Sequence, residues 1–282
     1  MELKKVTVPD VSRMKAAGER ITMVTAYDYA FARLLDQAGV DLLLVGDSLG
    51  MVVQGRETTL PVTLDEMVYH TCMVTRGRRR ALVVGDLPFG AYQTGSTRAL
   101  ESAVRLVKEG GAEAVKLEGG LPMAETIAAL TAVDIPVMAH IGLTPQSVHR
   151  MGGHRVQGRR SGHAPGQRER LLDDARAVEA AGAFAVVLEC IPLDLAAEIT
   201  AALAIPTIGI GAGAHCDGQV LVLHDLVGLS TDWTPRFAKR YAELGREVVR
   251  AAETYVQEVK TGVFPGEAQA FQARPAAAGN EG

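Results

Sequence analysis

The 282-residue chain contains few cysteines and few aromatic residues. It has three cysteines, one tryptophan and 5% aromatic residues in total. Cys72, Cys190 and Cys216 are odd in number and far apart, so they indicate neither a disulfide framework nor a zinc site built from closely spaced ligands. A small secreted fold held together by disulfides is therefore excluded, and the chain is long enough to bury a large core instead.

Long apolar runs and an excess of positive charge are also missing. No run is long enough to cross a bilayer, and Met1–Asp10 has two lysines without the apolar core of a signal peptide. The net charge is -4 and the sequence pI is near 6.0, which gives no electrostatic basis for binding nucleic acid or an anionic membrane. We therefore expect a cytoplasmic protein with small-molecule partners.

Short apolar runs alternate with helical patterns along the chain, as is typical of βα units. The predicted strands are Ile21–Asp28, Asp41–Ser48, Ala81–Pro88, Ala112–Gly119, Pro136–Leu143, Ala183–Cys190, Pro206–Gly213 and Gln219–Leu226. The predicted helices are Leu64–Arg76, Thr97–Glu109, Met123–Ala132, Arg168–Ala180, Leu193–Leu203 and Pro235–Lys260. Eight such strands predict an α/β fold, a parallel (β/α)8 TIM-type barrel. A doubly wound open sheet is the alternative, because periodicity does not show closure.

Residues 1–263 are expected to form this single barrel domain. Two connections are longer than the repeat requires: Gly50–Thr63, and Thr144–Gln167, which is rich in glycine and arginine and is expected to cap or line the site. The tail, residues 264–282, is rich in Ala, Gly, Pro and Gln, and we predict that it is disordered.

Polar side chains occupy the ends of five successive predicted strands. They are Asp47 and Ser48, Asp86, Lys116 and Glu118, His140, and Glu189. In a parallel barrel these ends share one face, where barrel enzymes carry out their chemistry. Lys116 and Glu118 are two residues apart on a strand and so point to the same side. The pattern predicts a cluster of carboxylates around one lysine and one histidine.

Such a cluster of carboxylates suits magnesium, a hard cation that prefers oxygen ligands and keeps part of its shell for water or substrate. Asp47 and Asp86, with Glu118 directly or through water, are the predicted ligands. The cation would chelate a 2-oxo acid and stabilise the enolate formed when the neighbouring carbon loses a proton. Glu189 is the predicted base, and Lys116 is predicted to steady the substrate carboxylate or the developing oxyanion.

Each residue also has a structural interpretation. A single aspartate at a strand end is more often a turn or cap residue than a ligand. Lys116 could simply neutralise Glu118, and Glu189 could pair with an arginine of the long loop. His140 is either a core histidine or a substrate contact, and Ser48 either caps a turn or contacts substrate. The constellation as a whole favours the metal site.

Several strings resemble the ketopantoate hydroxymethyltransferase family over nearly the whole chain. They are Val45–Gly50, Asp86–Gly90, Val115–Gly120, His140–Gln146, Glu189–Pro192, Gly209–Gly213 and Asp217–Gln219. The resemblance implies transfer of a one-carbon unit from 5,10-methylenetetrahydrofolate to 3-methyl-2-oxobutanoate, giving 2-dehydropantoate for pantothenate synthesis. It also implies a cytoplasmic homo-oligomer, commonly a homodecamer of two rings.

The resemblance assigns roles to the strand-end residues. It implies that Asp47, Asp86 and Glu118 belong to the magnesium site, that Asp47, Ser48, Asp86 and Lys116 contact the oxo acid, and that Glu189 is the proton acceptor. The sequence departs from the family at residues 159–170, which are more basic and somewhat longer than the family pattern.

Two other functions remain open. One is a different magnesium enolate enzyme, a carbon–carbon lyase or phosphomutase. Those enzymes typically place a catalytic cysteine in a flexible loop, and neither Gly50–Thr63 nor Thr144–Gln167 contains cysteine. The other is a non-catalytic barrel that binds a phosphorylated ligand through Gly209–Gly213, although such glycines more often allow close packing.

Overall fold

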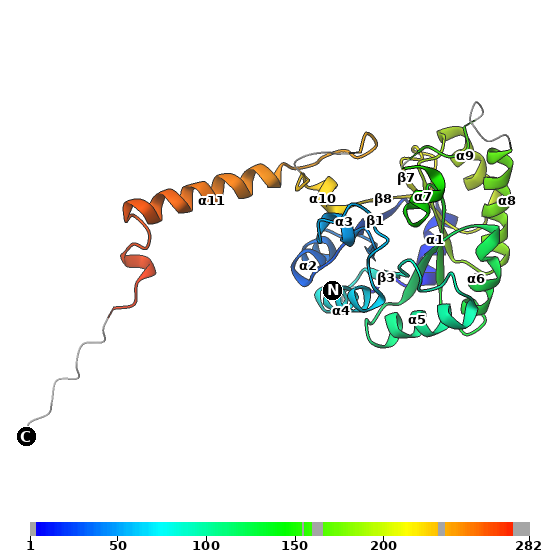
Figure 1. Ribbon diagram of the computed structural model, residues 1–282, viewed down its shortest axis with the longest axis horizontal. Helices are drawn as coiled ribbons and strands as arrows, with labels where there is room; N and C mark the ends of the chain where they lie inside the picture. Colours follow the sequence, from blue (N-terminus) through cyan, green and yellow to red (C-terminus); the bar gives the residue numbers. More distant parts are fainter. Residues whose placement is uncertain (1–3, 154, 160–165, 231–234, 273–282) are drawn as a thin grey trace, which may run out of the picture.

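The computed structural model describes residues 4–153, 155–159, 166–230 and 235–272. Eight parallel strands pair in chain order, and the last pairs with the first, so the sheet closes into a barrel (Figure 1). The strands are β1 (Ile21–Thr25), β2 (Leu42–Val45), β3 (Leu82–Asp86), β4 (Ala114–Glu118), β5 (Val137–Gly142), β6 (Ala185–Glu189), β7 (Thr207–Ile210) and β8 (Gly218–Leu221). The barrel prediction is confirmed, and the open sheet is excluded.

Helices surround the barrel and cover its outer surface. They are α2 (Tyr29–Gln37), α4 (Leu64–Gly77), α5 (Ser96–Lys108), α6 (Ala124–Thr131), α8 (Gln167–Ala180) and α9 (Leu193–Ala202). Shorter turns lie in the connections: α3 (Leu49–Val52), η1 (Leu121–Met123), η2 (Pro145–Ser147), α7 (Val148–Met151) and α10 (Leu223–Leu226). Of the helices in the described part of the chain, none combines the length and hydropathy that a membrane span requires.

The core has two layers. One apolar cluster fills the space between the strands and the outer helices, and the other lies inside the barrel. Val11 of the N-terminal helix α1 (Val8–Ala17) belongs to the inner cluster together with Met23 and Leu42. Lys15 of the same helix reaches Asp217, just before β8. Helix α1 therefore closes the amino end of the barrel, and the carboxyl ends of the strands remain for the site.

Predicted and observed elements differ most at the C-terminal end of the chain. The last strand was predicted to continue to Leu226, but it ends at Leu221 and α10 begins at Leu223. The helix predicted over Pro235–Lys260 is α11 (Leu244–Thr261), which starts nine residues later than predicted. The backbone N–H groups of Tyr241 and Leu244 donate to carbonyls of residues 226 and 227. These bonds hold the segment against α10 and prevent a helix there. The predicted helices within the barrel are confirmed to within two residues, whereas α1 and α2 were not predicted.

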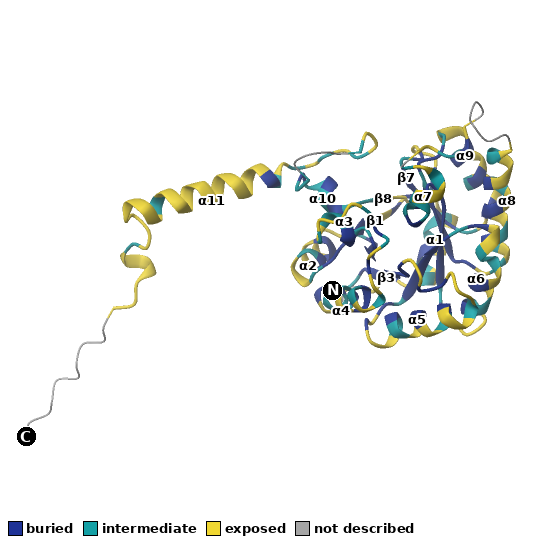
Figure 2. Ribbon diagram, viewed as in Figure 1, coloured by how far each residue is buried: buried dark blue, intermediate teal, exposed yellow. Residues whose placement is uncertain are grey.

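Helix α11 projects away from the barrel (Figure 1) and is exposed along most of its length (Figure 2). Its exposed residues include apolar side chains such as Val248, Val249, Tyr255, Val256 and Val259. Beyond it lies a short turn, η3 (Glu267–Gln269). Most of the tail predicted to be disordered, residues 273–282, lies outside the described residues, so that prediction and the domain boundary stay predictions.

Candidate active site

The register of the strands places the predicted site residues side by side. Asp86 of β3 lies opposite Lys116 of β4, and Glu118 of β4 lies opposite His140 of β5. Glu189, the last residue of β6, lies opposite Gly142 of β5. Asp47 and Ser48 follow β2 directly. The predicted strand-end residues therefore all lie at the carboxyl end of the barrel.

Gly142 allows β5 and β6 to approach closely at the site. Its φ of +96° lies in the left-handed region, and a Cβ there would come within 2.2 Å of the backbone oxygen of Glu189. Only glycine fits this conformation and this distance without displacing β6. Gly142 therefore helps to set the position of Glu189.

Lys116 and Asp86 form a buried ion pair. The Lys116 Nζ donates to both carboxylate oxygens of Asp86, at 2.8 and 2.7 Å, and both side chains are almost fully buried. Burial lowers the pKa of Lys116, but the carboxylates of Asp86, Glu118 and Asp47 outweigh this and raise it above the usual value. The lysine is thus held charged, and the partner that it neutralises is Asp86 rather than Glu118.

His140 lies between two carboxylates. Its Nε2 is 3.1 Å from Glu189 Oε2, and its Nδ1 is 3.5 Å from Glu118 Oε1. Burial and Lys116 lower the pKa of His140, but Glu118 and Glu189 outweigh them and raise it to about 9. The ring is therefore charged at neutral pH, and it connects Glu189 with the acidic cluster. Among the described residues, the positive partner of Glu189 is His140, and no described loop arginine pairs with it.

Gln146, in the turn η2, is a site residue that the sequence reasoning missed. Its backbone N–H donates to Glu118 Oε2 at 3.0 Å, and its side-chain Nε2 donates to Asp47 Oδ2 at 2.9 Å. The Tyr92 hydroxyl donates to Gln146 Oε1 at 2.7 Å. One buried glutamine therefore fixes two of the predicted metal carboxylates. The only signal in the sequence was its place at the end of the string His140–Gln146.

Ser48 has a defined partner as well. Its Oγ lies 2.9 Å from the hydroxyl of Tyr27, which follows β1. Burial raises the pKa of Tyr27 well above its usual value, so the phenol stays neutral. Ser48 is partly exposed at this face. The contact orients the serine and is compatible with either role predicted for it.

Negative charge exceeds positive charge at the site. Burial, Asp86 and Glu118 raise the pKa of Asp47 well above its usual value, although Lys116 and Gln146 lower it in part. Glu118 Oε1 is buried and accepts no hydrogen bond among the described residues, and the His140 ring nitrogen nearest to it is 3.5 Å away. Such a surplus of buried carboxylate is stabilised by a cation. The donor set, all oxygen, suits magnesium or a similar hard ion.

The carboxylates do not yet converge on one point. Within the described residues, no group of three or more His, Cys, Asp or Glu side chains has the arrangement of a metal cage. Lys116 holds both oxygens of Asp86, and Gln146 holds one oxygen of Asp47. A cation would therefore share these oxygens with their present donors and take further oxygens from water or substrate.

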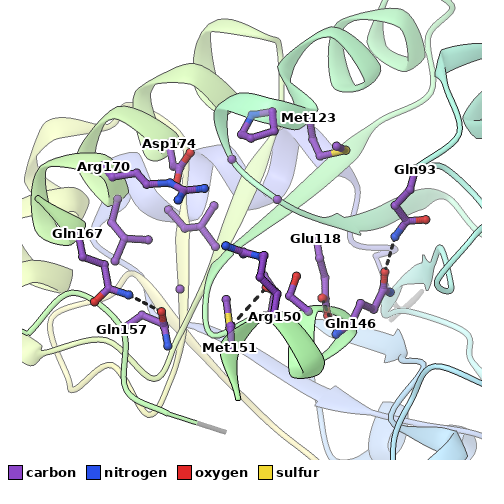
Figure 3. Close-up of a pocket in the computed structure, with 18 of the residues that line it drawn as sticks. Gln93, Glu118, Met123, Gln146, Arg150, Met151, Gln157, Gln167, Arg170 and Asp174 are labelled. Atoms are coloured by element: carbon purple, nitrogen blue, oxygen red, sulfur yellow. Dashed lines mark hydrogen bonds and ion pairs between the residues drawn. The ribbon is translucent and has the colours of Figure 1, made fainter. Parts of the chain in front are cut away.

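A pocket of about 430 Å³ leads away from the cluster, between the ends of β4 and β5 and the helices α7 and α8. Glu118 and Gln146 line it (Figure 3), and Gln146 connects it to the acidic cluster through Asp47. Arg150 and Arg170 extend into the space from α7 and α8 (Figure 3). Part of the predicted capping loop therefore does line the site, whereas residues 154 and 160–165 lie outside the described residues.

The glycines after β7 serve packing. A Cβ on Gly211 would meet the ring of Phe237 at 2.9 Å, and one on Gly213 would meet Leu193 at 2.8 Å. Both positions also have positive φ. This crowding supports the packing interpretation of Gly209–Gly213. Cys72, Cys190 and Cys216 are free thiols, as expected.

Comparison with known proteins gives a consistent result. The family model described as ketopantoate hydroxymethyltransferase matches residues 5–267. The 3-methyl-2-oxobutanoate hydroxymethyltransferase of Geobacter metallireducens is 58% identical over 268 residues, covering 95% of this chain and 99% of that protein. The enzyme with the same name from Trichlorobacter lovleyi is 59% identical over 268 residues, covering 95% and 99%.

Solved structures with similar folds are more distant in sequence. Phosphonopyruvate hydrolase superposes with a TM-score of 0.61 at 13% identity, covering 95% of this chain and 92% of that chain. For 2,3-dimethylmalate lyase, described as a member of the PEP mutase/isocitrate lyase superfamily, the TM-score is 0.59 at 18% identity, covering 95% and 89%. At these identities the likeness shows the fold alone.

Proposed function

Since this chain belongs to the ketopantoate hydroxymethyltransferase family, we propose that the residues at the carboxyl ends of β2 to β6 carry out the chemistry of hydroxymethyl transfer. The acceptor is 3-methyl-2-oxobutanoate, and the product feeds pantothenate synthesis. The family identity also implies methylenetetrahydrofolate as the co-substrate that supplies the one-carbon unit. The observation that carries the proposal is the buried cluster in which four carboxylates share one lysine and one histidine.

Glu189 is the base in this proposal. It takes the proton from the third carbon of the oxo acid, and the resulting enolate forms a carbon–carbon bond to the one-carbon unit of the donor. Overall, the two bonds from that unit to folate nitrogens break, one water supplies the hydroxyl of the product, and tetrahydrofolate leaves with the two protons released. Glu189 Oε2 lies 3.1 Å from His140 Nε2, and Glu189 ends β6, whereas Asp86 and Lys116 come from β3 and β4. A base placed there faces the carbon that reacts while the acidic cluster faces the oxygens of the substrate.

Asp47, Asp86 and Glu118 would hold a divalent cation, most simply Mg2+. When bound, the cation supplies positive charge beside the oxygen that becomes negative in the enolate. The chain's own residues prepare this site: Gln146 orients two of the carboxylates, and Lys116 donates to both oxygens of Asp86. Ser48 and Lys116 lie at the same face and are the proposed contacts for the substrate carboxylate.

Proton exchange tests this mechanism without the donor. The exchange of the proton at the third carbon of 3-methyl-2-oxobutanoate is followed by NMR in deuterated buffer, with Mg2+ and with EDTA. We expect exchange to need both Mg2+ and Glu189, so that Glu189→Gln lowers its rate about 1,000-fold, within the range for removal of a general base. The matched control is Glu198→Gln on the outer surface of α9, which should leave exchange unchanged.

The outcomes separate the parts of the proposal. Exchange that persists in Glu189→Gln would move the base role to His140, the next titratable side chain. Exchange that persists in EDTA would remove the metal role from the three carboxylates. If neither exchange nor product formed after a folate donor was added, the proposed chemistry would be wrong.

Assembly and location belong to the same proposal. We expect a cytoplasmic homo-oligomer, with a homodecamer as the specific form. Helix α11 supports self-association, because it leaves the barrel with several apolar side chains exposed. Exposed apolar side chains on one helix are typical of surfaces that become buried between subunits. Light scattering at several concentrations would measure the mass.

A further inference from the structure

The pocket beside the acidic cluster is larger than the acceptor requires. Its volume is about 430 Å³, which falls in the range of pockets that enclose a ligand of several rings, whereas the acceptor is a five-carbon acid. The acceptor's proposed contacts, Asp47, Ser48, Asp86 and Lys116, are not among the residues that line it. The volume is therefore available to a second and larger molecule.

The inner end of the pocket meets the acceptor site. Glu118 lines the pocket and also belongs to the acidic cluster, and Gln146 lines the pocket while donating to Asp47. A ligand that fills the pocket thus places its inner end beside the acceptor. A donor molecule has to do this, because its one-carbon unit must come within bonding distance of the enolate.

The pocket also has apolar walls. Phe89, Met123, Met151 and Leu171 contribute to them. Methionine side chains are flexible and make favourable contacts with aromatic rings. Walls of this kind suit a flat aromatic ring system rather than a sugar or a second small acid.

Two arginines mark the outer part. Arg150 of α7 makes no ion pair or hydrogen bond within the described part of the chain, and Arg170 of α8 faces only Asp174, at 3.8 Å. Figure 3 shows both side chains directed into the space between the two helices. Guanidinium groups in such positions bind carboxylates through paired, charge-assisted hydrogen bonds.

From these features we infer that this pocket binds the reduced-folate donor, with its ring end against Glu118 and the carboxylates of its glutamate tail on Arg150 and Arg170. A reduced folate has this order of groups: a fused ring that carries the one-carbon unit, a second aromatic ring, and a glutamate with two carboxylates. The assignment rests on the proposed function, since it names the site of that reaction's co-substrate.

Binding of two ligands that differ only in the glutamate tests the assignment. Tetrahydrofolate and tetrahydropteroate, which lacks the glutamate, are titrated anaerobically into the full-length chain by calorimetry. In the unmodified chain we expect tetrahydropteroate to bind about tenfold more weakly or worse, because a charge-assisted pair is worth at least about one decade in affinity. Arg150→Gln and Arg170→Gln should each lower the affinity for tetrahydrofolate about tenfold. They should lower the affinity for tetrahydropteroate less than about twofold.

A matched control lies on the same helix. Arg176 of α8 is exposed, pairs with Asp173 at 3.8 Å, and does not line the pocket. Arg176→Gln should bind both ligands like the unmodified chain. Both pocket arginines are also exposed, so their replacement is not expected to prevent folding, and thermal unfolding of each variant checks this.

Three results would overturn the assignment. One is equal affinity of the unmodified chain for the two ligands. Another is an affinity for tetrahydrofolate that is unchanged in both pocket variants. If the unmodified chain still forms product from methylenetetrahydrofolate in that case, the proposed function stands and only the pocket assignment fails. The third is an unmodified chain that exchanges the acceptor proton but never forms product from the folate donor, which removes the donor and its site together.

Discussion

The two ends of the barrel both bury acidic side chains, but they treat them differently. At the amino end, Asp36 accepts the backbone N–H groups of residues 79–81 at 2.7–2.9 Å. Asp217 accepts from the Lys15 ammonium at 2.9 Å and from the backbone and hydroxyl of Thr207 at 2.9 and 3.1 Å. Each carboxylate there has its own donors.

At the carboxyl end, four carboxylates share one lysine and one histidine. Asp47 and Asp86 have raised pKa values because of burial, and Glu118 keeps an oxygen with no hydrogen-bond partner in the described chain. The comparison shows how a structural charge differs from a functional one. A structural carboxylate is satisfied by the fold, whereas under the proposed function these await the substrate and the cation.

Removing the shared lysine should have the largest effect on stability. Lys116→Met leaves the carboxylate of Asp86 buried without its counter-charge, so we expect it to lower the free energy of unfolding by about 4 kcal/mol. At the other end, Lys15→Met should cost about 1 kcal/mol, because Thr207 still donates to Asp217. Urea unfolding in EDTA at pH 7.5 measures both. Equal losses would show that the two ends do not differ as described.

The charge on His140 should make the carboxyl end sensitive to alkaline pH. The pKa of His140 is raised to about 9 in the folded chain, so its stabilising charge is fully present below about pH 6.5, its unfolded pKa. The contribution then declines and is lost as pH rises through about 9. In EDTA, the unmodified chain should have a larger free energy of unfolding than His140→Gln at low pH. This difference should fall by as much as about 3 kcal/mol between about pH 6.5 and about pH 9.

The control for this pH prediction is a partly buried histidine, His224. Burial lowers the pKa of His224, so that ring is neutral in the folded chain throughout the window. The stability difference between the unmodified chain and His224→Gln should therefore stay nearly constant from pH 7 to pH 10. A decline of the same size in both variants would place the alkaline sensitivity outside the active site.

Gln146 should matter for activity more than for folding. Gln146→Ala removes the side-chain donor to Asp47 and the acceptor for Tyr92, so Mg2+ affinity and turnover should each fall about 10- to 100-fold, as for other residues that orient metal ligands. Gln54→Ala, which removes a contact with Glu66 and touches none of the cluster carboxylates, is the control. Calorimetric Mg2+ binding that is unchanged by Gln146→Ala would contradict the orienting role.

Replacing one aspartate at each end of the barrel should have the smallest effects, but the two effects should have opposite signs. Asp47→Asn keeps an acceptor for Gln146 but removes the ionisable carboxyl group. Burial and two neighbouring carboxylates raise the pKa of that group, so its charged form is unfavourable. We therefore expect the metal-free chain to gain about 1 kcal/mol of stability. Asp36→Asn at the amino end should instead lose about 2 kcal/mol, since a neutral amide offers one acceptor for three donors. Stabilisation at both ends, or at neither, would be evidence against the distinction.

The sequence predicted the barrel and most of the site, because both depend on local patterns. Continuous apolar runs identify buried parallel strands, and a charged residue at the end of such a run is recognisable without any knowledge of its neighbours. The register that places Glu118 opposite His140 needed the structure. Closure did too, since it depends on the pairing of β8 with β1.

Residues that act through long-range contacts could not be predicted. Gln146 lies in a short turn with no periodic pattern, and its role arises because the chain folds back from β5 over β4 and β2. Likewise, the helix expected from Pro235 begins at Leu244, because the backbone of Tyr241 bonds to α10 instead of continuing a helical turn. Tertiary hydrogen bonds overrode the local propensity in both places.

The closure of β8 against β1 has a consequence for synthesis of the enzyme. All the charged site groups come from β2 to β6. A nascent chain synthesised as far as Glu189 therefore carries them before β7 and β8, the last wall of the barrel, have formed. Closing that wall brings carboxylates that repel one another close together. An ion that binds only the closed barrel stabilises the closed barrel by mass action, by about 2.7 kcal/mol when the ion is present at a hundredfold excess over its Kd. Cells short of the cation are therefore expected to lose folded enzyme before the remaining molecules turn over more slowly.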